Sequence, residues 1–407
     1  MKKKPEQLNN GNKKASILVL VIAAVLFLAT AVWIHSQNIL NGMEDHFTAY
    51  GDGMVEFEKG VVREILSEDM KREEQADGAW QGNQELSVVI RSGRYKGELM
   101  TANNYFGSIY GVPLETGDGV ILTVKTHADG SHIATVYEFD RIPALAVCLL
   151  VFFAVIALVG GRTGLKSLIG LICTVVCLFV ILIPLLLKGA PTVPTTFFVC
   201  AFIAVVCFTI LGGVHRKTVS AFLGTLAGMV LAIVFGLAAQ HFAKIDGLRL
   251  DNAESLLQMR YYGSPLRLKG LLVAGIVIST LGAVMDVAMS ISSSMEEVHA
   301  ANPSLSRREL FRSGMNIGHD MAGTMTNTLI LAFLGSEFSL IIFLYAQGLT
   351  FYRLFSTPFV GLETISGLAS STGMILAIPL TAMISSVMLT NHSRGGTSAG
   401  RKKKAAR

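Results

Sequence analysis

Long apolar runs separated by short polar segments dominate the chain. A helix rises about 1.5 Å per residue, so about 20 residues cross the roughly 30 Å hydrocarbon core of a bilayer. In lipid, only a helix satisfies the backbone of an open-ended segment by itself. The pattern therefore predicts a polytopic α-helical membrane protein with eight transmembrane helices, at Ile17–Ile34, Pro143–Val159, Leu168–Leu187, Thr196–Leu211, Ala221–Ala239, Leu271–Ser290, Met321–Tyr345 and Gly367–Leu389.

One long polar stretch, at residues 35–141, lies between the first two runs. Its short strand-like segments are separated by turns that contain Gly, Asp or Ser, and this spacing predicts a small antiparallel β domain, an OB-like barrel. The second and third segments are expected to form one hairpin, and the fourth and fifth another. The segments are Met54–Ile65, Leu86–Arg91, Tyr95–Thr101, Val120–Thr126 and Ile133–Phe139.

Charge separates this stretch from the rest of the chain. It holds 18 acidic and 9 basic side chains, a net charge of −9, whereas the whole chain carries +5. An OB-like barrel invites a nucleic-acid interpretation, but an acidic surface repels phosphate, so we expect no nucleic-acid partner. We interpret the stretch as a solvated cap, docking or gating module outside the membrane.

Lysine and arginine recur on alternate sides of the runs, which sets the orientation by the positive-inside rule. Placing the basic ends inside predicts that both termini are cytoplasmic. The expected order is a basic cytoplasmic tail, a signal anchor, the acidic extracytoplasmic domain, a seven-helix membrane domain and a second basic cytoplasmic tail, at residues 1–16, 17–34, 35–141, 142–390 and 391–407. The basic residues between Lys244 and Lys269 do not fit this scheme, because it places them outside the membrane. Nearby acidic residues partly balance their charge.

Two features of the apolar runs have alternative interpretations. The first run contains Ala29-Thr30-Ala31, which resembles a signal-peptide cleavage site, but the apolar residues that follow favour an uncleaved anchor. Cys173 and Cys177 lie one helical turn apart, as a metal pair would, but small packing residues are the preferred interpretation. We expect no metal, no cofactor and no disulfide framework.

Two tight turns open with Gly-Gly, at Gly160–Ser167 and Gly212–Ser220, and each continues with basic residues and a serine that would cap the next helix. They are either a duplicated helical hairpin, as many transporters contain, or a chance similarity. 

Polar residues inside the apolar runs concentrate in the last third of the chain. Asp286 and Ser290 share one helix face in the sixth run, and a carboxylate inside a span is a functional candidate. Measured from Leu268, Asp286 lies about 27 Å along the helix, near the cytoplasmic boundary. The start of the seventh run adds polar residues at the same level. We predict either one substrate or ion pocket, or a structural hydrogen-bond network, formed by Asp286, Ser290, Asn316, His319, Asp320, Thr324 and Asn327.

The seventh run is interrupted at Gly335-Ser336-Glu337. Discontinuous helices of secondary transporters expose their half-helix ends to ions or substrates. A further full crossing after this break would place the basic carboxyl terminus outside, so we predict a kinked or re-entrant segment. Glu337 therefore joins the candidate pathway residues.

Several long motifs resemble the YibE/F family of bacterial multi-pass membrane proteins. They are Gly270-Leu271-Leu272 through Ser290, Ser313-Gly314-Met315-Asn316-Ile317-Gly318-His319-Asp320 continuing through Leu329, Gly161-Arg162-Thr163-Gly164-Leu165 and Pro379-Leu380-Thr381. The resemblance covers about residues 141–389, and His319 departs from it, where a basic residue such as arginine is expected. It implies a location in the bacterial cytoplasmic membrane and no established activity.

Three functions compete for this pattern. The first is a permease for an unidentified small solute or ion, and the second is a scaffold or sensor that binds a partner through the outer domain. The third is an intramembrane aspartyl hydrolase that uses Asp286 and Asp320. The chain lacks zinc-protease, serine-hydrolase and phosphate-binding loop motifs, so we expect no enzyme. The lipid bilayer is the expected partner, and a homo-oligomer or a membrane partner remains open.

Overall fold

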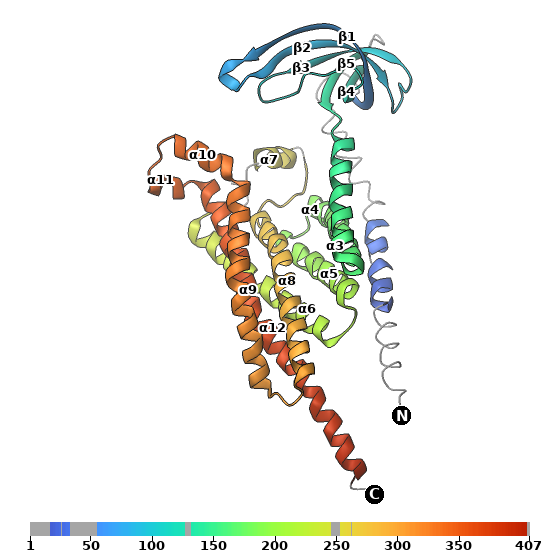
Figure 1. The fold of residues 1–407 in the computed structure, drawn as a ribbon. Helices are drawn as coiled ribbons and strands as arrows, with labels where there is room; N and C mark the ends of the chain where they lie inside the picture. Colours follow the sequence, from blue (N-terminus) through green and yellow to red (C-terminus); the bar gives the residue numbers. More distant parts are fainter. Residues whose placement is uncertain are drawn as a thin grey trace. The chain divides into compact units, whose positions relative to one another are not determined.

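The chain forms two compact units, each described by itself below (Figure 1). In the computed structural model, residues 17–25, 27–32, 55–126, 132–245, 253–261 and 263–404 are described. One unit comprises Asn38–Val159, and the other comprises Met1–Gln37 with Gly160–Arg407. The amino-terminal basic tail and the turn expected between the segments Val120–Thr126 and Ile133–Phe139 lie outside the described residues.

The first unit contains a closed five-stranded barrel, which confirms the small β domain (Figure 1). Its strands are β1 (Val55–Glu73), β2 (Ala79–Ile90), β3 (Leu99–Phe106), β4 (Gly119–Thr126) and β5 (His132–Phe139). They follow the order β1-β2-β3-β5-β4 around the barrel. The expected hairpins β2–β3 and β4–β5 are antiparallel, and only β3 and β5 pair in parallel.

Alternating side chains fill the barrel, because successive residues of a strand point to opposite faces. Leu86, Val88 and Ile90 of β2 are fully buried, as are Val120 and Leu122 of β4. This alternation of buried and exposed residues is the pattern from which the strands were predicted.

Strand limits in the β domain differ from the prediction in two places. β1 and β2 continue beyond the predicted ends and pair as far as Glu73 with Ala79, where Asp77 and Gly78 have positive φ. This extension is largely solvated and so lacks the apolar alternation that marks a half-buried strand. Tyr95 lies in a loop rather than in a strand, and its ring packs into the barrel core.

A buried carboxylate anchors the β2–β3 loop. Glu58 of β1 is 3% exposed and accepts hydrogen bonds from the Ser92 Oγ at 2.6 Å and from the Arg94 backbone N–H at 3.0 Å. Paired in this way, the buried charge avoids most of the cost of leaving water. The polar residue therefore contributes to the specification of the loop.

The remaining described chain is mainly helical, and most of its helices run beyond the apolar runs that predicted them. The principal helices are α3 (Ile142–Cys177), α4 (Ile183–Leu187), α5 (Thr192–Gly212), α6 (Arg216–Ala243), α7 (Ala253–Tyr261), α8 (Leu271–Ala301), α9 (Arg307–Ser336), α10 (Phe338–Ala346), α11 (Phe351–Phe355) and α12 (Pro358–Lys404), with a π-helical segment at Leu178–Leu182. A helix also covers the apolar segment Ile17–Val32.

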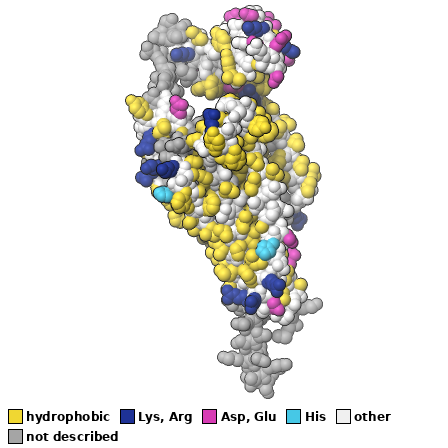
Figure 2. Space-filling view, turned by 90° about the vertical axis from the view of Figure 1, so that its left-hand side faces the viewer, with side chains coloured by type: hydrophobic (Ala, Val, Ile, Leu, Met, Phe, Trp, Pro, Cys, Tyr) yellow, Lys and Arg dark blue, Asp and Glu magenta, His cyan; other side chains and the backbone are white. Residues whose placement is uncertain are grey.

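Five described helices are long and apolar enough to cross a membrane, or six if the bent pair α9–α10 is one span. The pair bends by 61° at Glu337, which confirms the predicted interruption. One of the five is the 46-residue stretch Ile142–Leu187, in which the backbone of Gly161 is non-helical. Figure 2 shows hydrophobic side chains over much of the helical unit, as expected for a surface in contact with lipid.

The second glycine of each Gly-Gly turn takes a positive φ. Gly161 has φ 52° and ψ −134°, and Gly213 has φ 66° and ψ −177°. Glycine reaches this region without steric cost, so both turns use the same residue for the same purpose. The predicted cap by Ser220 is wrong, because α6 begins at Arg216 and leaves Ser220 inside its second turn.

Candidate functional site

Three long helices, α6, α8 and α12, form the centre of the helical unit, and small residues let them approach closely. A Cβ added to Gly228 of α6 would meet Ala377 of α12 at 2.8 Å, Val284 of α8 at 2.9 Å and the Gly373 carbonyl oxygen at 3.0 Å. Glycines at helix interfaces permit this kind of close backbone packing in lipid. This packing fixes which face of each of the three helices points into the bundle.

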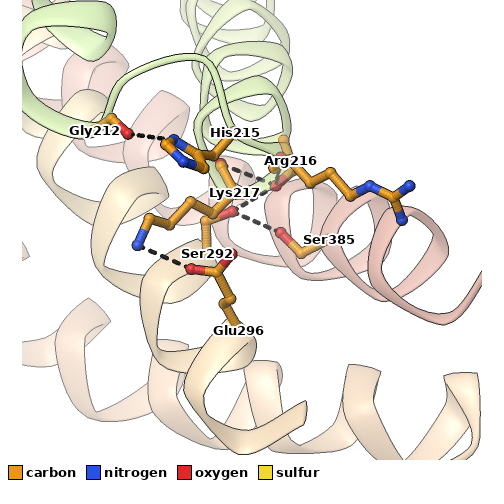
Figure 3. Close-up of polar contacts among 8 residues, drawn as sticks. Gly212, His215, Arg216, Lys217, Ser292, Glu296 and Ser385 are labelled. Atoms are coloured by element: carbon orange, nitrogen blue, oxygen red, sulfur yellow. Dashed lines mark hydrogen bonds and ion pairs between the residues drawn. The ribbon is translucent and has the colours of Figure 1, made fainter. Parts of the chain in front are cut away.

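A chain of three hydroxyl groups links these helices at one level (Figure 3). The oxygen atoms of Ser220 of α6 and Ser292 of α8 lie 2.6 Å apart, and those of Ser292 and Ser385 of α12 lie 2.8 Å apart. All three side chains are almost fully buried. Hydroxyl groups both donate and accept, so each member of this buried chain has a hydrogen-bond partner.

Charged groups lie one turn beyond the hydroxyl chain. The Lys217 Nζ is 2.8 Å from a Glu296 carboxylate oxygen, and the Arg216 guanidinium donates to the Met388 carbonyl oxygen at 3.2 Å. Figure 3 shows both cations extending from the start of α6 toward the neighbouring helices. This end of the bundle is the one that the distribution of basic residues assigns to the cytoplasm.

Sequence reasoning missed Ser292 and Ser385. Both follow apolar residues and carry no spacing signal of their own. The only available signal was helical register, since Ser292 shares a face with Ala288 and Met295, which are buried. Hydroxyl residues at core positions of a span are the signal that could have identified the chain.

The predicted polar cluster lies elsewhere, on the outer sides of α8 and α9. The side chains of Asp286, Ser290, Asn316, Asp320 and Asn327 are all exposed. His319 is exposed as well, and the Thr324 hydroxyl donates to its own helix, at the Met321 carbonyl oxygen. Within the described residues, no hydrogen bond joins α8 to α9 through these groups, so the structural network proposed for them is not present in one chain.

Asp286 lies level with the polar residues of α9, as expected, although it makes no hydrogen bond with them. Gly314 of α9 lies against Met295 of α8, and Gly318 lies against Ile291 four residues earlier, so the two helices run antiparallel. Extending this pairing by five residues places Asp286 level with Gly323 of α9. Asp286 is therefore at the depth of the polar residues of α9, on a neighbouring helix.

Four of the exposed residues on α9 share one face. Asn316, Asp320, Gly323 and Asn327 follow one another at intervals of four, three and four residues. Leu310, Gly314 and Gly318, in contrast, are buried against α8 and α12. At 100° per residue the two sets lie on opposite sides of the helix. We refer to Asn316, Asp320, Gly323 and Asn327 as the α9 stripe.

Glu337 lies at a pocket formed where α9 bends into α10. The pocket has a volume of about 180 Å³, and α12 supplies its other wall. The lining is mainly apolar, with Phe333, Ile341 and Phe359 among its residues, and two carboxylates, Glu337 and Glu363, border it. Gly367 of α12, also in the lining, lies against the Phe333 ring and lets the two helices approach each other there.

The geometry of the helix break explains why Glu337 reaches the pocket. Its backbone N–H donates to the Phe333 carbonyl oxygen at 3.3 Å, and its carbonyl oxygen accepts from the Ile341 N–H at 3.0 Å. Glu337 therefore ends one helix and begins the next, and its side chain lies at the bend. Interrupted helices of transporters bind their solutes at such positions.

Across the described part of the chain, no group of three or more His, Cys, Asp or Glu residues is arranged to hold a metal ion. Cys173 and Cys177 do lie together, with 4.0 Å between their sulfur atoms, but among the described residues they belong to no group of three that could hold a metal ion.

Comparison with known proteins gives one result. A family model described as YibE/F-like protein matches residues 148–391. This range covers the long apolar helices from α3 to α12 and excludes the barrel. No curated protein matches the chain, and no solved structure does.

Proposed function

The chain belongs to the YibE/F-like family, and from this premise we propose that it is a permease for small cations with an apolar body. The observation that carries the proposal is the pocket at the α9–α10 break, where Glu337 and Glu363 border mainly apolar walls. An apolar wall favours an apolar ligand, and a carboxylate in such surroundings is stabilised by a positive partner. A small alkylammonium ion meets both requirements.

The proposed route continues from this pocket along α9. Ile330 and Leu334 line the pocket and extend the four-and-three spacing of the α9 stripe toward Glu337. His319 and Thr324 flank the stripe on the same helix, and its carboxylate and amides would take the place of water around a moving cation. Asp286 and Ser290 lie at the same depth on the outer side of α8, where they form a second polar surface.

The topology proposed for this permease has eight crossings in the bacterial cytoplasmic membrane, with both termini cytoplasmic. Breaking Ile142–Leu187 at Gly161 makes two crossings, the bent pair α9–α10 makes one, and the Ile17–Val32 segment is the anchor. The positions of lysine and arginine support this orientation.

Uptake of tetraethylammonium into proteoliposomes tests the proposal. Glu337→Gln removes a negative charge with almost no change in shape, so we expect uptake to fall at least about tenfold, as the loss of one strong ionic contact predicts. Glu297→Gln, on an exposed glutamate at the end of α8, is the matched control and should leave uptake unchanged. Uptake equal to that of protein-free vesicles would overturn the proposal.

A scaffold that binds a partner through the barrel is the second candidate. Phe57 of β1 and Tyr137 of β5 form an edge-to-face pair with ring centroids 5.2 Å apart, and the two residues are 57% and 62% exposed. Aromatic residues gathered on a surface are typical of protein-binding sites. This pair is the surface that such a partner would contact.

A further inference from the structure

The loop between β3 and β4, residues 107–118, presents apolar side chains on the surface of the barrel. Ile109 is 95% exposed, Tyr110 is 61% exposed, and Val112 is exposed as well. We refer to these three residues as the loop tip. The loop at the other end of β3, residues 91–98, is different, because most of its exposed side chains are charged: Arg91, Arg94, Lys96 and Glu98.

Two buried amide side chains hold the backbone next to the loop tip. Gln84 accepts a hydrogen bond from the Leu114 backbone N–H at 2.9 Å and donates to the Leu114 carbonyl oxygen at 3.1 Å. Asn104 donates to the Val112 carbonyl oxygen at 3.0 Å. Both amides are 2% exposed, so the barrel itself fixes the loop in the conformation that leaves the tip outside.

Strand directions place this loop at the end of the barrel from which α3 leaves. β3 and β5 are parallel, and Asn103 pairs with Thr135, so Phe106 at the end of β3 lies about level with Glu138 near the end of β5. α3 begins at Ile142, directly after β5 (Figure 1). The barrel and the first part of α3 belong to the same compact unit.

The length of α3 places this end of the barrel close to the bilayer. From Ile142 to the break at Gly161, the helix rises about 30 Å, the full thickness of the hydrocarbon core. The crossing therefore has to start at Ile142. The connection from Phe139 spans at most about 10 Å, little more than the headgroup layer of about 5–8 Å. It is also fixed, because Asp140 donates to the Gly119 carbonyl oxygen at 2.8 Å.

The composition of the loop tip suits the headgroup layer. Tyrosine is enriched at this depth, where its ring meets lipid and its hydroxyl meets water. Apolar side chains that reach the boundary of the acyl chains are removed from water. From Gly107 to Leu114 the loop has no charged side chain that would oppose this transfer.

We propose that the loop tip inserts into the headgroup layer of the bilayer that α3 crosses, and so gives the barrel a second attachment to the membrane beside α3 itself. The inference rests on the crossing proposed to begin at Ile142. It is independent of the solute that the helical unit transports.

Quenching by brominated lipid tests the inference. Trp33 and Trp80, the two tryptophans of the chain, are replaced by phenylalanine, and Ile109→Trp introduces a single new one. The full chain is reconstituted in phosphatidylcholine vesicles with or without bromine near the headgroup end of the acyl chains. Bromine quenches tryptophan on contact, so we expect Ile109→Trp to lose fluorescence in the brominated vesicles.

Leu99→Trp is the matched control, because Leu99 is also apolar, is 55% exposed and lies at the opposite end of β3. Its fluorescence should be the same in both kinds of vesicle. Leu145→Trp, at a residue of α3 that is 64% exposed, should be quenched because it lies inside the crossing.

Three outcomes would overturn the inference. If Leu145→Trp is quenched and Ile109→Trp is not, the loop tip lies in water although the crossing is correct. Equal quenching of Ile109→Trp and Leu99→Trp would show that the barrel has no lipid-facing end. An unquenched Leu145→Trp would overturn the crossing itself, and the inference with it.

Discussion

The contribution of a single side chain to stability depends on whether it points into the helix bundle or away from it. Ser292 and Ser290 lie two residues apart on α8, yet one is fully buried in a hydroxyl chain and the other is exposed. Hydrogen bonds between transmembrane helices contribute about 0.6 kcal/mol on average and up to about 1.7 kcal/mol. The position of the hydroxyl, rather than its chemistry, decides its contribution to stability.

Ser292→Ala should therefore lower the free energy of unfolding by about 1 kcal/mol, because it removes the centre of the chain and leaves Ser385 with no described hydrogen-bond partner. Reversible unfolding in mixed micelles measures this change. Ser290→Ala is the control on the same helix and should have almost no effect. Equal stability of the two variants would contradict the importance assigned to the hydroxyl chain.

At the scale of elements, helices that approach closely have glycine where their backbones meet. Helices that lie farther apart interact through polar side chains. Gly228 lies between α6, α8 and α12, whereas Gly275 of α8 has no neighbour within 4 Å of its added Cβ. The same substitution should therefore have opposite effects at the two positions.

Gly228→Ala should destabilise the helical unit by about 1–3 kcal/mol, because the new methyl group would press against the Gly373 carbonyl oxygen, which cannot move without its helix. Gly275→Ala should instead stabilise it by up to about 1 kcal/mol, since alanine favours the helix. Thermal unfolding in detergent compares the two. A Gly228→Ala variant as stable as the unmodified chain would show that α6 and α12 pack less closely than described.

At the scale of the whole molecule, the barrel belongs to one compact unit, Asn38–Val159, and the helices that follow Gly160 belong to the other. The barrel has its own core, in which Val62 of β1, Leu86 of β2 and Leu122 of β4 are buried. A unit with its own hydrophobic core is expected to fold independently.

Excised residues 50–141 should form a monomeric β-rich protein with one cooperative unfolding transition, followed by the fluorescence of Trp80 on β2. The ring of Trp80 lies 4.7 Å from the Arg72 guanidinium carbon, so unfolding should change its environment. The remaining chain, with a short linker in place of the barrel, should retain tetraethylammonium uptake if the permease proposal holds. Loss of uptake in a correctly inserted variant would favour the scaffold function instead.

The sequence by itself determined the membrane class, the small β domain and the interruption at Glu337, because each leaves a local periodic pattern. Apolar length predicts a span, alternation predicts a strand, and a Gly-Ser-Glu break predicts a bend. Strand limits were less well predicted for β1 and β2, whose solvated ends pair without an apolar period.

Only the tertiary structure decided which polar face points inward. Helical periodicity shows that Asn316, Asp320 and Asn327 share a side, and equally that Ser292 shares one with Met295, but it does not give the direction of either side. That direction depends on which neighbouring helices supply a fitting surface. Here Gly314, Gly318 and Gly228 allow close contacts among α6, α8, α9 and α12, and these contacts leave the α9 stripe on the outside.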